Sequence, residues 1–223
     1  ACLHNWYWFV LSIIACGSLA YLYSKAQTKL YSASAKIIIT TKDTKTAGSQ
    51  AAVFSDLGVT GSNNIISNEI YKLKSTSLME TVVNQLGLNI RYYGHVYLRD
   101  VNIYKTSPVQ ITPLQDVKEA FSMTVVPKGG NNLEFRINEG EWKKARFGNK
   151  VNTDVGPIAI TKTSHYDETY VDFKTIARVA PVAQVAKALE ANLKAECADK
   201  FSDVVNLTFT ADNNQMCIDV LNA

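Results

Sequence analysis

An uncharged apolar stretch near the N-terminus constrains this chain more than any other feature. Residues 6–23 contain no charged side chain, and as a helix rising about 1.5 Å per residue they cross most of a hydrocarbon core about 30 Å thick. Aromatic side chains mark both ends, where the headgroup layers of a bilayer would lie. They are Trp6, Trp8, Tyr21 and Tyr23. The sequence therefore predicts a transmembrane anchor over residues 1–24, with the lipid bilayer as a partner.

Other interpretations of this stretch stay open. A cleaved signal peptide is one, although no basic residue precedes Trp6 and the small-residue triplet of residues 33–35 lies well past the apolar run. A buried core helix is another. Lys25 and Lys29 follow the stretch and, by the positive-inside rule, favour a cytoplasmic body. The chain starts without Met and ends in an apolar helical pattern, so it is expected to be a fragment. Basic residues before Ala1 in the full protein would then also influence the orientation of the span.

Charge and cysteine content narrow the possible functions. The chain has 23 basic and 20 acidic residues, which give a net charge of +3. This excess is too small and too interleaved to predict a nucleic-acid partner. The histidines are too scattered to predict a metal site. Cys197 and Cys217 could pair in an oxidising compartment, but two free buried thiols are the favoured interpretation.

Residues 25–99 are predicted to form the first part of an α/β domain. Alternating apolar residues from Tyr31 to Ile39 indicate a half-buried strand. Polar and glycine-containing residues 41–64 predict a long loop. Apolar residues then recur every three to five positions between Ile66 and Leu86 and stop at Gly87. This predicts one or two amphipathic helices with a glycine at the C-terminal end.

A β-rich insertion is predicted over residues 100–165. Apolar residues alternate in segments around Met123, Phe135 and Ile158, a period typical of strands. The connecting segments 128–132 and 138–141 contain the Gly and Asn of tight turns. The insertion is expected to be a small antiparallel sandwich or barrel.

Residues 166–223 are predicted to complete the α/β domain. Pro181 opens a helix whose apolar stripe runs to Leu193. Val205 to Phe209 alternate as a strand, and a new helix begins near Asp212. The fold class is therefore α+β: one N-terminal transmembrane helix and an α/β core interrupted by the β-rich insertion.

No complete active site is expected in this sequence. The pair Glu139 and Glu141 is interpreted as solvated turn residues rather than paired catalytic carboxylates. The crowded Ser164, His165 and Asp167 do not converge from separate elements as a triad does. Four tyrosines could stack on sugar rings but more often pack in a core. They are Tyr92, Tyr93, Tyr97 and Tyr104. The basic run beside Trp142 is interpreted as a strand edge protected by charge. It comprises Lys143, Lys144, Arg146 and Lys150.

Two parts of the chain resemble the Wzz family of chain length determinants, or polysaccharide co-polymerases. The resemblance covers residues 1 to about 90 and about 170 to 223. It is carried by the segments His4–Phe9, Ala20–Tyr23, Tyr31–Ile39, Asn68–Ile70, Leu86–Leu88 and Asp199–Leu207. The β-rich insertion resembles that of members fused to a cytoplasmic bacterial tyrosine kinase of the Bacteroidetes type.

This resemblance implies a function and a location. Family members span the bacterial inner membrane, place their main domain in the periplasm and assemble into homo-oligomeric rings. They work with a polysaccharide polymerase and an outer-membrane export protein to set the chain length or export of capsular polysaccharide and exopolysaccharide. No cofactor is implied for this segment, and ATP with Mg²⁺ is implied only if a kinase part follows residue 223.

Two other classes of function remain as alternatives. A periplasmic adaptor of the membrane-fusion type also combines one N-terminal span with a β-rich body, and it should contain a long helical hairpin and paired lipoyl-like halves. A secreted sugar-active enzyme would need a cleaved N-terminus and convergent carboxylates.

Overall fold

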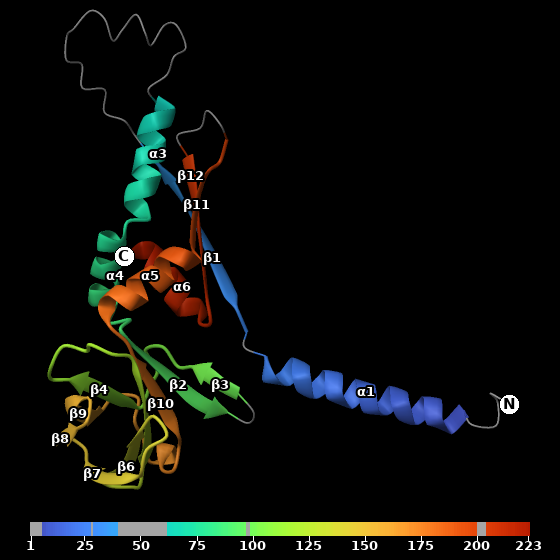
Figure 1. Ribbon diagram of the computed structural model, residues 1–223, viewed down its shortest axis with the longest axis vertical. Coiled ribbons are helices and arrows are strands. Elements are labelled where there is room, and N and C mark those ends of the chain that lie inside the picture. The colour runs from blue at the N-terminus through green and yellow to red at the C-terminus, as the bar shows by residue number, and fades with distance from the viewer. Residues whose placement is uncertain (1–5, 28, 40–61, 97–98, 200–203) are drawn as a thin grey trace, which may run out of the picture.

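The computed structural model describes residues 6–27, 29–39, 62–96, 99–199 and 204–223. Three parts follow one another in Figure 1: the apolar helix, a layer of helices on a three-stranded sheet, and a block of two further sheets. The loop predicted over residues 41–64 falls mostly on residues 40–61, which lie outside the described residues. Ser62, at its end, already begins a helix.

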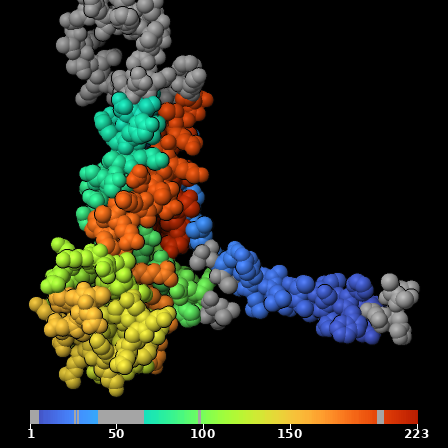
Figure 2. Space-filling view, viewed as in Figure 1, coloured from blue at the N-terminus to red at the C-terminus, as the bar shows by residue number. Residues whose placement is uncertain are grey.

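Helix α1 (Trp6–Ala26) carries the apolar stretch and projects away from the rest of the chain (Figure 1 and Figure 2). Between Trp6 and Lys25 it is long and apolar enough to cross a membrane, and none of its length is buried against the described protein. The interpretation of this stretch as a buried core helix is therefore wrong. Side chains this apolar are stable only outside water, so α1 fits the predicted anchor.

The strand predicted after the anchor is β1 (Tyr31–Ile38). It pairs antiparallel with β12 (Val204–Ala211), which pairs on its other side with β11 (Leu193–Cys197), so the sheet has the order β1-β12-β11. Alternate residues of β12, from Val205 to Phe209, are buried. This confirms the predicted period of two. The opposite face of the sheet carries polar side chains such as Ser34 and Thr208, which are register partners.

Four helices cover the buried face of this sheet (Figure 1). They are α3 (Ser62–Leu73), α4 (Thr76–Leu86), α5 (Val182–Asn192) and α6 (Asn214–Asn222). The main core is built from Val83 of α4, Leu189 of α5, Met216 of α6 and Phe209 of β12, each at most 1% exposed. A smaller cluster around Ile66 joins α3 to the same sheet.

The helix boundaries follow local chemistry. The Leu78 backbone N–H donates to the Ser75 side chain at the start of α4, and Gly87 ends it with a left-handed φ of 65°, as the sequence predicts. Pro181 precedes α5 as predicted. The expected continuation of this helix to Leu193 is wrong, because α5 ends at Asn192 and Leu193 starts β11. Leu193 is buried in β11, and its apolar side chain also fits the apolar stripe of a helix, so the sequence pattern did not distinguish the two.

The second core lies between two antiparallel sheets, with strand orders β3-β2-β10-β5-β6-β7 and β4-β9-β8. The strands are β2 (Ile90–Val96), β3 (Arg99–Asn102), β4 (Val109–Pro113), β5 (Phe121–Pro127), β6 (Asn132–Ile137), β7 (Lys143–Arg146), β8 (Lys150–Thr153), β9 (Gly156–Lys162) and β10 (Thr175–Val179). Met123 and Phe135 of the larger sheet and Ile111 and Ile160 of the smaller one share this core. Two sheets enclosing one core form a sandwich. The described strands close no barrel.

The six-stranded sheet is wider than the segment predicted for the insertion. Two of its interior strands, β2 and β10, come from the segments on either side of residues 100–165, and they pair with each other in the sheet. β2 follows α4 after a short connection, and β10 leads into α5. The two cores are therefore linked by two strands that run directly into the helical layer.

Side chains also join the β block to the helical layer. The Asn102 side-chain amide donates to Asp212 at 2.7 Å, and the Asn213 amide donates to the Asn102 carbonyl at 3.1 Å. Lys105 Nζ lies 2.6 Å from Asp219 Oδ2 on α6. These contacts place the end of β3 and the loop after it against the start and the surface of α6.

The Lys105–Asp219 pair predicts a pH dependence. Hydrogen bonds from Lys105 and Gln215 hold the pKa of the Asp219 carboxyl below its usual value. A lowered pKa stabilises the folded state at pH values above the ordinary carboxyl pKa of about 3.9, and this contribution is lost as the pH falls through the folded-state pKa. Asp219→Asn is expected to destabilise the protein at pH 7 and to differ less from the wild type at pH 3.

Urea unfolding at both pH values measures this difference. Glu139→Gln, on an exposed turn, is the control and should match the wild type at both. If Asp219→Asn lowered the free energy of unfolding by the same amount at pH 3 and pH 7, the proposed role of the Asp219 charge would be contradicted.

Candidate functional site

The predicted anchor, helix α1, is the first candidate functional element. Trp6 and Trp8 at one end and Tyr21 and Tyr23 at the other are 62 to 69% exposed. Along a helix the centres of these two groups lie about 22 Å apart, which is most of the thickness of a hydrocarbon core of about 30 Å. Their role as aromatic belts at the two membrane interfaces stays a prediction.

The body begins close to the end of the anchor. Only residues 26–28 separate Lys25 from Lys29, so the chain allows at most about 14 Å between these two residues. Lys29 and Tyr31 line a small pocket together with Arg99 and Asp100 of β3 and Asp212. The edge strand β3 therefore lies close to the C-terminal end of α1, where the chain enters the body.

The six-stranded sheet has an outer face that points away from the second core. Register partners share a face, so the outer face can be followed from strand to strand. Its basic and aromatic members are Arg91, Tyr93, His95, Arg178, Arg136, Lys144 and Arg146. Lys174 and Trp142 extend the same rows just beyond β10 and β7, since the His95 N–H donates to the Lys174 carbonyl and Arg136 lies 5.0 Å from the Trp142 ring.

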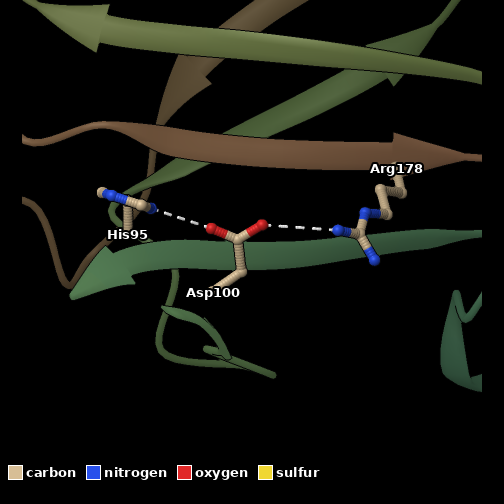
Figure 3. Close-up of polar contacts among 3 residues, drawn as sticks. All are labelled: His95, Asp100 and Arg178. Atoms are coloured by element: carbon tan, nitrogen blue, oxygen red, sulfur yellow. Dashed lines mark hydrogen bonds and ion pairs between the residues drawn. The ribbon is translucent and has the colours of Figure 1, made fainter. Parts of the chain in front are cut away.

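Figure 3 shows Asp100, a carboxylate of β3 on this outer face. Asp100 Oδ1 lies 2.9 Å from His95 Nδ1, and Asp100 Oδ2 lies 3.4 Å from Arg178 Nη2. The Arg178 guanidinium also lies 4.4 Å from the Tyr93 ring. Burial, and after it the charge of Asp212, raises the pKa of Tyr93. These contacts orient Arg178 along the sheet surface.

A cleft of ≈ 490 Å³ lies between the end of α4 and the β block. The Tyr92 hydroxyl accepts from the Ile111 N–H at 2.8 Å and lies 3.4 Å from the Ile111 carbonyl, to which it donates. Burial raises the pKa values of Tyr92 and Tyr104. Tyr92 packs against the second core and Tyr104 against the first, as the favoured interpretation of the tyrosines holds, and both also line the cleft. Tyr97 lies outside the described residues.

The carboxylates and the triad-like residues take structural or solvated positions. Glu139 and Glu141 are exposed on the turn between β6 and β7. Ser164 and His165 are exposed, and Asp167 begins the 3-10 turn η2 (Glu168–Tyr170). Hydrogen bonds from the Thr169 hydroxyl and backbone N–H lower the pKa of Asp167. This arrangement offers no convergent acid, base or nucleophile.

The predicted basic run lies at sheet edges. Lys143, Lys144 and Arg146 belong to β7, at the edge of the larger sheet, and Lys150 belongs to β8, at the edge of the smaller one. This confirms their interpretation as edge residues.

Cys197 and Cys217 are both free thiols. Cys217 is buried as expected, whereas Cys197 is exposed near the end of the edge strand β11. The sequence interpretation was therefore correct for one of the two side chains.

Sequence reasoning missed the outer face of the six-stranded sheet. Arg91 and Arg178 were not recognised because β2 and β10 were not recognised as strands. The sequence did contain a strand signal here. Lys174, Ile176 and Arg178 alternate with smaller residues that are buried in β10. The two segments are distant in sequence, so their pairing was not visible.

Comparison with known proteins supports one part of the resemblance. The profile of the Wzz family, described as "Chain length determinant protein", matches residues 2–86. The match runs from the start of the anchor to the last residue of α4. No curated protein matches the chain. The resemblance of the N-terminal part to chain length determinants is thus confirmed by a separate comparison, while the tyrosine-kinase branch has no such support.

Proposed function

We propose that this chain is the anchored part of a polysaccharide co-polymerase of the bacterial inner membrane. It controls the chain length or export of capsular polysaccharide or exopolysaccharide and carries out no covalent chemistry of its own. One observation carries this proposal: the family match over residues 2–86 coincides with a fully exposed apolar helix that leads directly into the edge strand β1.

The body is proposed to lie in the periplasm. Support comes from the family resemblance, whereas Lys25 and Lys29 favour the opposite orientation. A second membrane span and a cytoplasmic tyrosine-kinase part that binds ATP and Mg²⁺ are proposed to follow residue 223. Phosphorylation in that part would regulate assembly.

Assembly into a homo-oligomeric ring is part of the same proposal. The sheet β1-β12-β11 supports it, because β1 is an edge strand and one face of the sheet bears exposed polar side chains. An open edge and an uncovered face can both accept a neighbouring subunit. A polysaccharide polymerase and an outer-membrane export protein are the proposed partners of the ring.

The adaptor alternative receives less support. A membrane-fusion adaptor needs a long helical hairpin, whereas the longest described helix of the body is α3, with 12 residues. The enzyme alternative lacks convergent carboxylates among the described residues.

Polysaccharide size in cells tests the proposal. Deleting the gene is expected to change the modal chain length of the surface polysaccharide, or to abolish its export, on a gel stained for carbohydrate. The wild-type gene and Glu139→Gln should both restore the profile, because Glu139 is only a surface residue here. An unchanged profile in the deletion strain would refute the proposed function, and failure of Glu139→Gln alone would favour the sugar-active enzyme.

A further inference from the structure

The outer face of the six-stranded sheet contains an unfavourable arrangement of charge. Arg91 of β2 and Arg178 of β10 are direct register partners. Like charges directly opposite one another destabilise a sheet. Of these two arginines, only Arg178 has a carboxylate partner, Asp100, at 3.4 Å. Folding alone does not account for placing Arg91 beside a second guanidinium.

Further cations on the outer face have no carboxylate partner within the described residues. These cations are Arg91, Lys174 and Arg136, whereas Lys144 is the register partner of Glu134. Glu134, the other carboxylate on this face, lies 3.7 Å from Lys128, which also binds Asp172. Asp100 and Glu134 each have a cation partner, and Asp212 accepts from the Asn102 side chain and lies close enough to Tyr93 to raise its pKa. Among the described residues, Arg91, Lys174 and Arg136 form no ion pair.

Arg136 adds an observation of a different kind. Its Nε atom is buried and has no hydrogen-bond partner in the described structure. A buried donor without a partner is unfavourable, because it has lost its hydrogen bonds to water. The guanidinium lies against the Trp142 ring, whose residue is 48% exposed. An acceptor arriving from outside would meet a cation and an aromatic ring together.

We propose that the outer face binds a polysaccharide that carries carboxylate groups. This inference rests on the proposed function, which supplies a polysaccharide as the molecule handled, and it adds the chemical class of that polymer. The guanidinium groups of Arg91 and Arg136 match carboxylates in geometry and charge. The exposed Trp142 offers a ring on which sugars can stack.

The shape of the face favours a polymer over a single small ion. Neighbouring strands lie about 4.8 Å apart, so the cations from β2 to β7 are spread over about 20 Å. They are distributed across an open sheet surface rather than gathered in one pocket. Repeated negative charges on one chain would contact several of them at once.

A binding measurement tests the proposal with the full chain in nanodiscs of zwitterionic lipid. The probe is an oligomer of polygalacturonate, and the neutral comparison is dextran of the same length, both followed by calorimetry. Polygalacturonate is expected to bind at least tenfold more tightly than dextran, and more weakly at 0.5 M salt, because salt screens exposed charges.

Variants locate the binding site. Arg91→Gln combined with Lys174→Gln should weaken polygalacturonate binding at least tenfold without lowering the unfolding temperature, since neither side chain has a carboxylate partner. Arg91→Lys should keep most of the binding. Lys118→Gln combined with Lys187→Gln removes the same charge from exposed positions elsewhere and should change binding less than twofold.

Three outcomes would overturn the proposal: equal binding of dextran and polygalacturonate, equal losses in the two double variants, or equally tight binding of a DNA oligonucleotide of the same charge. The last would show only unspecific ion exchange. These results are independent of the polysaccharide profile of the deletion strain. An unchanged profile would refute the proposed function even if polygalacturonate binds. A failure of polygalacturonate to bind would refute the binding proposal even if the profile changes.

Discussion

Replacing Phe209 with alanine is expected to lower the free energy of unfolding by about 3–5 kcal/mol. Phe209 is 1% exposed and lies in β12, opposite Ala33 of β1 and Leu193 of β11. Its ring fills the core between the sheet and α4, α5 and α6. Small neighbours such as Ala33 cannot fill the cavity that truncation leaves, because packed interiors relax only partially.

Urea unfolding of the full chain in nanodiscs, followed by circular dichroism, measures this loss. Tyr71→Ala is the control, because Tyr71 is 75% exposed on α3 and should change stability by less than about 0.5 kcal/mol. Similar stabilities of the two variants would contradict the position of Phe209 in the core. Phe135→Ala, in the second core, should shift the same single transition, since β2 and β10 connect the two cores.

The second large effect is expected in the anchor. Ile14→Asp places a charge near the middle of α1, where a change from Ile to Asp costs about 3–4 kcal/mol of insertion free energy. This corresponds to a decrease of about 100- to 1,000-fold in the ratio of inserted to free protein. Ile14 is 60% exposed and has no described protein contact to protect the charge beyond a hydrogen bond from Ser18 to its carbonyl.

Carbonate extraction of cell membranes measures insertion. The wild type and Trp8→Phe are expected in the membrane pellet, because phenylalanine keeps the aromatic side chain at the interface. Ile14→Asp is expected in the soluble or degraded fraction. Retention of Ile14→Asp in the pellet would mean that α1 packs against protein rather than lipid.

Elements with a strong local signal could be predicted from the sequence. The apolar helix α1 follows from its length and lack of charge, β1 from strict alternation, and the end of α4 from Gly87. The β5–β6 turn follows from Gly129 and Gly130, both of which have positive φ values. Each of these features depends on residues close together in the chain, so pattern and propensity suffice.

Elements defined by distant partners could not be predicted in the same way. β10 joins the sheet only through its register with β2 and β5, which lie about 85 and 55 residues earlier in the chain. β11 was hidden because Leu193 fits the apolar stripe of α5 as well as it fits a strand. The outer-face cations were missed for the same reason: Arg91 and Arg178 become neighbours only when the sheet forms.

The central claim is that α1 spans the inner membrane and holds the body on its outer side. Cys197 provides a direct test, because it is an exposed free thiol, whereas Cys217 is buried. Burial also raises the pKa of the Cys217 thiol, which lowers the fraction of reactive thiolate. Cys197 should therefore be the only body cysteine that reacts quickly with a maleimide.

The measurement is labelling of intact cells, with a permeabilised outer membrane, by a maleimide that cannot cross the inner membrane. The account predicts that the wild-type protein is labelled before cell lysis and that Cys197→Ser abolishes this label. Labelling of Cys197 only after lysis would place the body in the cytoplasm, as Lys25 and Lys29 suggest, and would contradict the account.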